Sequence, residues 1–108
     1  MTARERIVDE VTSWSGVTSG HGERGEFAFK VGGREIGHLH GGRVAHFSLP
    51  KDVGVQLREQ GRVGDHPVFP DRVGLGERTI AGDDDVRDVV ALIRLNYDRI
   101  VERYGVPT

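Results

Sequence analysis

The chain has 108 residues and a mass of 11.9 kDa, which is the size of one domain. Its 15 basic and 17 acidic residues are interspersed and give a formal net charge of −2, a balance that does not favour nucleic-acid phosphates. Because there is no cysteine, disulfides, thiolate metal sites and cysteine nucleophiles are excluded. We therefore expect a single domain over residues 1–108, with no nucleic-acid partner and with chemistry limited to oxygen and nitrogen side chains.

The sequence also predicts where in the cell the protein lies. No apolar run approaches the ~18 residues that a membrane span needs, and residues 1–6 are largely polar and charged rather than an apolar leader. The expectation is a cytoplasmic protein without a membrane partner.

The first predicted element is an amphipathic helix that ends near residues 15–16. Thr2 is followed three residues later by Glu5, the pattern of a capping box. The apolar residues behind them recur at helical spacing: Ile7, Val8, Val11 and Trp14. Residues 18–25 hold three glycines and no periodicity, which predicts a loop with His21 in solvent.

Three β-like runs follow, at residues 26–31, 34–40 and 43–49, separated by two Gly-Gly pairs. Such pairs are typical of two-residue hairpin turns, so the runs predict a three-stranded antiparallel meander. With two-residue turns, Phe29 lies opposite Ile36, and His38 lies opposite Ala45. One face of the sheet then collects His38 together with most apolar residues, and His46 lies on the other face. The residues of the apolar face are Phe27, Phe29, Val31, Ile36, His38, Ala45, Phe47 and Leu49.

The second half predicts two helices and one strand. A short helix begins at Pro50 and ends at Gly61, and a loop follows over residues 62–76. A fourth strand is expected over residues 76–81, and the acidic run 83–85 supplies the N-cap of a long helix that stops at residue 105. The predicted fold is α+β, with three to four strands in an antiparallel meander, helices packed on one face and the order α-β-β-β-α-β-α.

His38 and His40 alternate along one strand, so their side chains point to the same face and could share a metal ion. A third ligand is required, and the two-residue turns put His46 on the opposite face. A three-residue loop at 41–43 would bring His38 opposite His46, but it would also turn Phe47 away from the other apolar residues. A metal site therefore stays the weaker alternative, and the expected site contains no metal and no cofactor.

The preferred interpretation is a pocket between the sheet and the helices, with His38 in its wall. A neutral imidazole can take or give a proton near neutral pH, so we expect His38 and the loop residue His66 to be the catalytic groups. The expected ligand-binding residues are Trp14, Phe27, Phe29, His38, His40 and Ala45.

Several motifs over residues 14–101 resemble the luciferase domain family. The most specific are the run 34–40 (REIGHLH) and the helix 92–99 (LIRLNYDR). That family comprises small bacterial proteins and a domain of fungal luciferases, which oxygenate a hydroxylated hispidin, a polyphenol-like pyrone, without a known metal or organic cofactor. The resemblance implies a pocket for a planar organic molecule, with His38 and His40 as the family's histidine pair and His66 as its loop histidine.

The chain departs from the family pattern at two places. An acidic residue commonly stands where this chain has His46, and Arg72-Val73-Gly74 replaces a Ser-Gly-Trp that would supply an aromatic wall. Light emission is therefore not expected. The order of elements is also similar to that of YjbR-like proteins, some of which are described as DNA-binding, although the charge balance argues against nucleic acid here.

Two classes of function follow from these observations. The first is a protein that binds a small organic molecule, with enzymatic oxygenation or acid–base chemistry left open. The alternative is a non-catalytic protein–protein interaction module whose sheet edge docks a partner. The expected state is a monomer or a homodimer.

Overall fold

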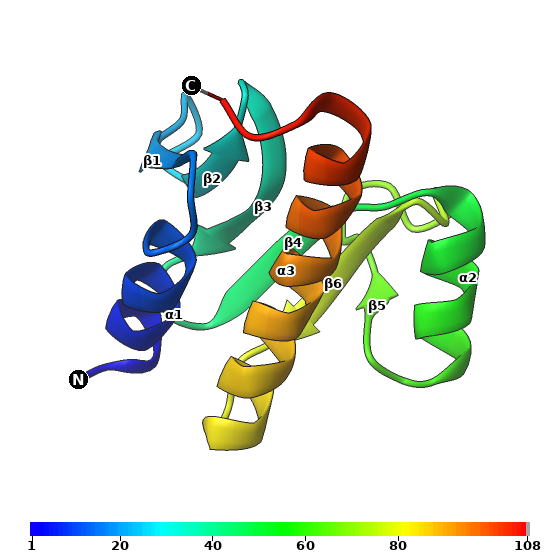
Figure 1. Ribbon diagram of the computed structural model, residues 1–108. Coiled ribbons are helices and arrows are strands. Elements are labelled where there is room, and N and C mark those ends of the chain that lie inside the picture. Colours follow the sequence, from blue (N-terminus) through cyan, green and yellow to red (C-terminus); the bar gives the residue numbers. More distant parts are fainter. Residues whose placement is uncertain (108) are drawn as a thin grey trace.

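The computed structural model describes residues 1–107, and within them the chain forms three helices and one antiparallel sheet of six strands (Figure 1). The predicted α+β class is confirmed, although the sheet has six strands rather than three or four. The helices are α1 (Ala3–Thr12), α2 (Lys51–Glu59) and α3 (Asp83–Tyr104). The strands are β1 (Val17–His21), β2 (Phe27–Val31), β3 (Arg34–His40), β4 (Val44–Ser48), β5 (Gly64–Asp65) and β6 (Leu75–Thr79), in the sheet order β1-β2-β3-β4-β6-β5.

The helices begin where local capping predicts. Thr2 and Glu5 form the expected capping box, with both backbone-to-side-chain distances at 3.1 Å. The N-cap of α3 is Gly82 rather than an aspartate, which corrects the prediction. Asp85 still serves this end of the helix, because its carboxylate accepts hydrogen bonds from the backbone N–H groups of Ala81 and Gly82.

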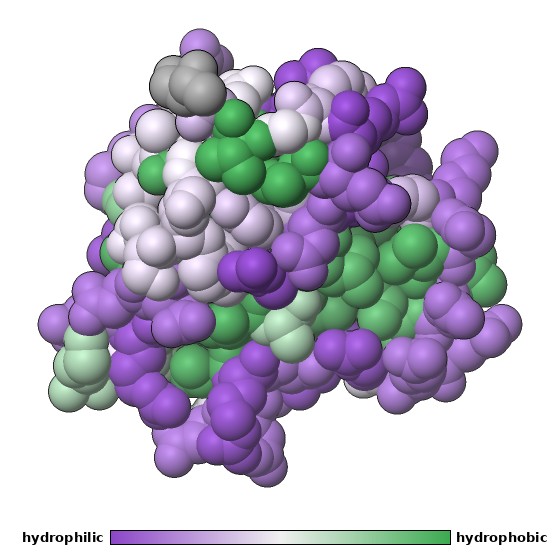
Figure 2. Space-filling view, in the orientation of Figure 1, coloured by the Kyte–Doolittle hydropathy of each residue, from purple (hydrophilic) through white to green (hydrophobic). Residues whose placement is uncertain are grey.

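Helices α1 and α3 lie over the same face of the sheet and enclose the core, whereas α2 stands at the side near β5 (Figure 1). Figure 2 shows this face, with polar residues around it and an apolar band between α3 and α2. The sheet face that carries no helix is called the outer face below. The most deeply buried large side chains are Phe29, Phe47, Ile7, Ile36, Leu39, Leu92 and Ile93. Within residues 1–107 no helix is both long and apolar enough to cross a membrane.

The register of β2, β3 and β4 differs from the prediction at two points. The tight turn at Gly32 and Gly33 has two residues, as expected, and Val31 pairs with Arg34. Beyond this turn a β-bulge inserts one extra residue into β3, so that Phe29 pairs with Gly37 instead of with Ile36.

The second difference is the connection from β3 to β4. Three residues, 41–43, join the strands, so His38 pairs with His46, and Leu39 takes the expected place of His38 opposite Ala45. The prediction that His38 lies on the apolar face was therefore wrong, whereas His46 lies on the other face as predicted, and the two histidines share that face. The bulge is the physical reason, because it reverses the alternation within β3.

The bulge makes the three-residue loop at 41–43 compatible with a single apolar face of the sheet. Ile36, the extra residue of the bulge, points into the core, and so does Leu39 farther along β3. Ile36 and Phe47 therefore share a face, although the loop between β3 and β4 has three residues. A side chain at Gly37 would crowd this arrangement, since a Cβ there would lie 3.1 Å from Cγ1 of Ile93 in α3. Any larger residue at this position would require Ile93 to shift by a few tenths of an ångström, so glycine suits the close approach of α3.

Two strands were not foreseen. β1 forms within the segment predicted to be a loop, and β5 is a two-residue strand within the predicted loop 62–76. Neither has the alternation of a half-buried strand, and both form because a neighbouring strand supplies backbone partners: β2 for β1 and β6 for β5. The predicted fourth strand is confirmed as β6, and His21 is exposed as expected.

Candidate functional site

Three histidines meet on the outer face of the sheet. His38 and His40 come from β3, and His46 comes from β4 directly opposite His38. Their ring centroids lie 4.6–5.2 Å apart. His66, in the loop after β5, adds a fourth ring 4.7 Å from that of His46. The sheet thus gathers four of the five histidines of the chain at one place, and we call these four residues the histidine cluster.

Two glutamate carboxylates lie within hydrogen-bond distance of two of these rings. Nδ1 of His38 lies 2.9 Å from Oε2 of Glu35, and Nε2 of His46 lies 2.7 Å from Oε2 of Glu77. Glu77 belongs to β6 and is the cross-strand partner of His46. Nε2 of His40 lies 3.2 Å from Nδ1 of His46. Nε2 of His38 is thereby left for other contacts, while Nδ1 of His46 faces His40.

The environment also keeps two of the rings neutral. Burial lowers the pKa of His46 from its ordinary value of 6.5, against the opposing effect of its hydrogen bond to Glu77, and the neighbouring His40 and His38 lower it further. Burial, with a smaller contribution from His46, also lowers the pKa of His66. Both imidazoles are therefore neutral at pH 7 and can accept or donate hydrogen bonds.

The histidine cluster forms the floor of a cleft of about 630 Å³. The connection between β1 and β2 borders it on one side with Arg24, and the loop after His66 borders it on the other with Pro67 and Val68. Lys30 and Glu35 add one cation and one anion at the end nearest the first hairpin. The cleft therefore offers imidazoles at its centre, charges of both signs around it and an apolar patch at one border.

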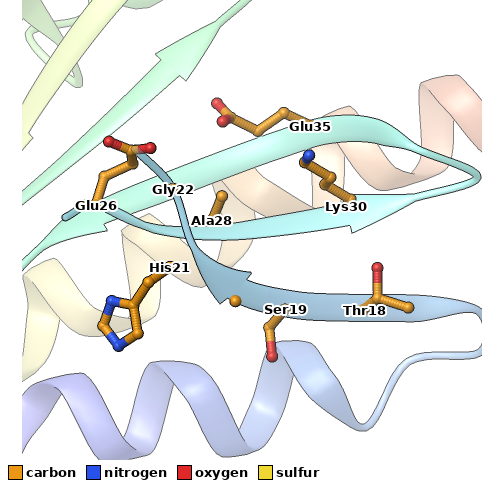
Figure 3. A pocket seen from close by; sticks show the side chains of 9 residues that line it. Thr18, Ser19, His21, Gly22, Glu26, Ala28, Lys30 and Glu35 are labelled. Carbon is orange, nitrogen blue, oxygen red and sulfur yellow. The ribbon is translucent and has the colours of Figure 1, made fainter. Parts of the chain in front are cut away.

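A smaller hollow of about 260 Å³ adjoins this cleft between β1, β2 and β3. Figure 3 shows that the side chains of Glu26, Lys30 and Glu35 rise on one side of these strands, whereas Ser19 and His21 point to the side of α1. His21, the fifth histidine, is thus separated from the histidine cluster. It packs its ring against Phe27 at 5.1 Å.

The residues predicted for the site divide between the two faces of the sheet. His38, His40 and His66 line the cleft together. Phe29 and Ala45 are fully buried in the core on the other face. Phe27 packs beside Phe29, and Trp14 packs on Tyr97 of α3 with ring centroids 5.4 Å apart. The space between the sheet and the helices, where the pocket was expected, is occupied at these positions by core side chains.

Sequence reasoning missed three members of the site. His46 was considered as a third ligand, and a three-residue loop at 41–43 was the signal that could have found it. Glu35 lies three residues before His38 and could have been paired with it only after the bulge was known. Glu77 had no local signal, because its place beside His46 depends on the pairing of β4 with β6.

One of the comparisons with known proteins identifies the family of the chain. A family model described as Luciferase domain matches residues 33–96, which is more than half of the chain. The matched range contains the four residues of the histidine cluster together with Glu35 and Glu77, whereas Arg24 lies outside it. The comparison with curated proteins and the comparison with solved structures gave no match. The similarity to YjbR-like proteins stays a prediction.

Proposed function

The chain belongs to the luciferase domain family, and on this premise we propose that its cleft on the outer face binds a small planar organic molecule. The observation that carries the proposal is the convergence of four histidines on the floor of one cleft. Ligand sites are concave and place a few polar groups within a volume of about 300–1,000 Å³. The cleft, at about 630 Å³, falls within this range.

The lining favours a ring that carries hydroxyl or carbonyl oxygens. Pro67 and Val68 offer an apolar surface for the flat side of a ring, and the imidazoles below offer hydrogen bonds to its oxygens. Arg24 and Lys30 line the cleft beside three glutamates, so charges of both signs are available to the polar groups of a ligand. A hydroxylated pyrone of the kind that the family resemblance implies has these features.

His38 and His66 keep the catalytic roles expected from the sequence. The carboxylate of Glu35 orients the ring of His38, which leaves Nε2 to take a proton from a ligand hydroxyl. Nδ1 of His66 accepts the backbone N–H groups of Val68 and Phe69 at 3.1 and 3.3 Å, so in the neutral ring Nε2 carries the proton and is a donor. One acceptor and one donor thus line the same cleft.

The test is an amide NMR titration of the ¹⁵N-labelled chain with 4-hydroxy-6-methyl-2-pyrone in the presence of EDTA. We expect saturable shifts at residues 35–40, 44–46, 66 and 68. Loss of one hydrogen bond of ~1 kcal/mol in His38→Ala or His66→Ala should weaken binding about fivefold. His21→Ala is the matched control, because His21 points to the other side of the sheet, and it should leave the affinity unchanged.

Two outcomes would overturn the proposal. The first is a spectrum that does not change up to the solubility limit of the pyrone. The second is a set of shifts centred on Trp14 and the helices instead of on the outer face, which would return the site to the side of the sheet where the sequence alone had placed it.

A further inference from the structure

We propose that His38, His40 and His46 together bind one divalent transition-metal ion, with zinc as the best match. Each ring offers one nitrogen, and the three nitrogens lie within 4.8 Å of one another. This site goes beyond the binding of an organic molecule and does not depend on it, because the three ligands come from the chain alone. It also differs from what the sequence favoured, since the expected site held no metal.

The spacing of the nitrogens fits a tetrahedral ion. Zinc–nitrogen distances of about 2.0–2.1 Å place neighbouring ligand nitrogens of a tetrahedron roughly 3.3–3.4 Å apart. Nε2 of His40 and Nδ1 of His46 lie 3.2 Å apart, close to that separation without an ion between them. The other nitrogen pairs lie within 4.8 Å, and any separation above the tetrahedral value has to shorten. His38 is only partly buried and His40 is exposed, so rotation of their side chains can supply this movement.

The carboxylates support the same assignment independently. Histidines that bind metals usually donate the N–H of their other ring nitrogen to a carboxylate or a carbonyl, which fixes the tautomer and the direction of the ring. Glu35 stands in this place behind His38, and Glu77 stands in it behind His46. These contacts occupy Nδ1 of His38 and Nε2 of His46, so the remaining nitrogen of each ring is the one available to a metal. For His38 this atom is Nε2, so the proton-accepting role proposed for it above applies to the metal-free cleft.

The donor set selects the class of ion. Three imidazoles suit zinc and other late first-row metals, whereas Mg²⁺ and Ca²⁺ prefer oxygen ligands. Three protein ligands leave the fourth position of a tetrahedron open, which is the arrangement of catalytic rather than structural zinc sites. His66 is a neighbour and not a fourth ligand in this assignment, since its Nδ1 already accepts two backbone N–H groups.

The test uses the full chain, free of any histidine tag and stripped of metal, titrated with ZnCl₂ by calorimetry and with CoCl₂ by visible absorption. We expect one ion per chain with a Kd below about 1 μM, together with the intense visible bands of low-coordinate Co²⁺. His40→Ala should abolish the tight binding. Glu77→Gln should weaken zinc about 10–100-fold through the lost support of His46. His21→Ala should match the unmodified chain.

A control on the metal-free proteins tests whether each variant still folds. His40 is exposed, so its alanine variant should keep the circular dichroism and melting temperature of the metal-free parent. Absence of tight 1:1 binding in the parent, or retention of that binding in both His40→Ala and His46→Ala, would overturn the metal site. The pyrone titration is made in EDTA and the zinc titration without pyrone, so either proposal can fail while the other stands.

Discussion

Asn96 is the residue on which the shape of β3 depends most directly. Its side chain is fully buried in α3, and its Nδ2 donates to the carbonyl oxygens of Ile36 and Ser48 at 3.3 and 3.1 Å. Ile36 is the extra residue of the bulge and pairs with no residue of β2. The amide thus satisfies backbone oxygens that a regular ladder would have used, as buried polar groups require.

We predict that Asn96→Ala destabilises the protein by about 2–3 kcal/mol, because the carbonyl oxygens of Ile36 and Ser48, the first of them buried, lose their donor. Urea unfolding followed by circular dichroism measures this change. The arrangement of the cleft residues should be disturbed as well, because the bulge determines the face of the sheet on which His38 lies. A variant whose free energy of unfolding stays within about 0.5 kcal/mol of the parent would show that the bulge does not need this side chain.

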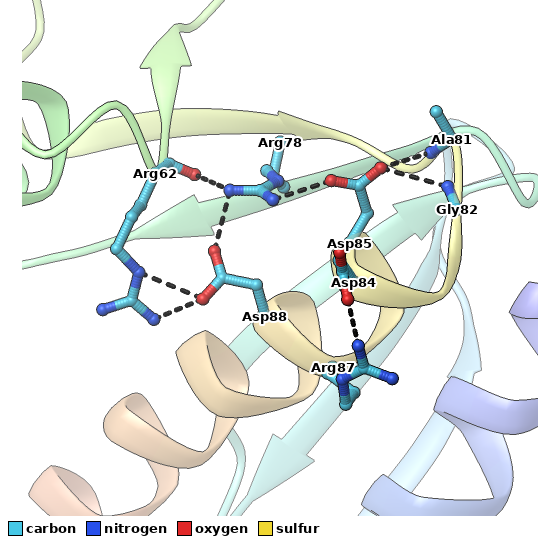
Figure 4. A network of polar contacts seen from close by, with 8 residues as sticks. All are labelled: Arg62, Arg78, Ala81, Gly82, Asp84, Asp85, Arg87 and Asp88. Atoms are coloured by element: carbon cyan, nitrogen blue, oxygen red, sulfur yellow. Dashed lines mark hydrogen bonds and ion pairs between the residues drawn. The ribbon is translucent and has the colours of Figure 1, made fainter.

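At the scale of elements, a network of arginines and aspartates joins β6 to the first turns of α3 (Figure 4). Arg78 of β6 donates to Asp85 at 2.7 Å and to Asp88 at 2.8 Å, and Arg62 donates to Asp88 from Nε at 3.0 Å. Asp85 in turn accepts from the backbone at the beginning of α3. The network fixes the N-terminal end of α3 against the strand that also carries Glu77.

This network predicts a dependence of stability on acid pH. The backbone N–H of Ala81, followed by the side chain of Arg78, holds the pKa of Asp85 below its ordinary value of 3.8. Folding therefore favours the ionised carboxyl, so its stabilisation is complete above pH 3.8 and is lost as the pH falls through the lower folded pKa.

Asp85→Asn should accordingly be less stable than the parent at about pH 7, with a difference that shrinks as the pH falls below 3.8 and through the lowered pKa of the folded state. Urea unfolding across this range measures it. Asp84→Asn is the matched control, because the side chain of Asp84 is 91% exposed and contacts only Arg87 of the network residues. A constant difference between parent and Asp85→Asn at all pH values would contradict this account.

At the scale of the whole molecule, the sheet has two free edges, β1 and β5. They contain five and two residues, and β1 is polar and mostly exposed. Pairing of such edges between two chains would add few backbone hydrogen bonds and would bury little of the ~1,000 Å² that a stable interface needs. The large exposed apolar side chains are divided among the N-terminus, α2, the loop between β5 and β6, and the C-terminal end of the chain: Met1, Val55, Val68, Phe69, Tyr104 and Val106.

We therefore predict that the chain is a monomer at micromolar concentration. Sedimentation velocity in EDTA, which prevents bridging by metal ions, should give a single species near 11.9 kDa. A dimer that survives dilution would instead favour the protein–protein interaction module, the alternative function that the sequence left open.

The sequence by itself determined the elements whose signal is local. The capping box at Thr2, the paired glycines at 32–33 and the apolar periodicity of α3 act between residues that are close along the chain, and each predicted its element. The family resemblance was also local, since it depended on short motifs, and the match over residues 33–96 confirms it.

Only the tertiary structure decided which face of the sheet carries the site. A one-residue shift moves a whole strand to the other face, and the bulge in β3 depends on Asn96 and on the approach of Ile93 to Gly37, both from a helix more than fifty residues away. The pairing of β4 with β6 likewise brings Glu77 to His46 across thirty-one residues. The histidines could be named from the sequence, but their meeting in one cleft is a consequence of these long-range contacts.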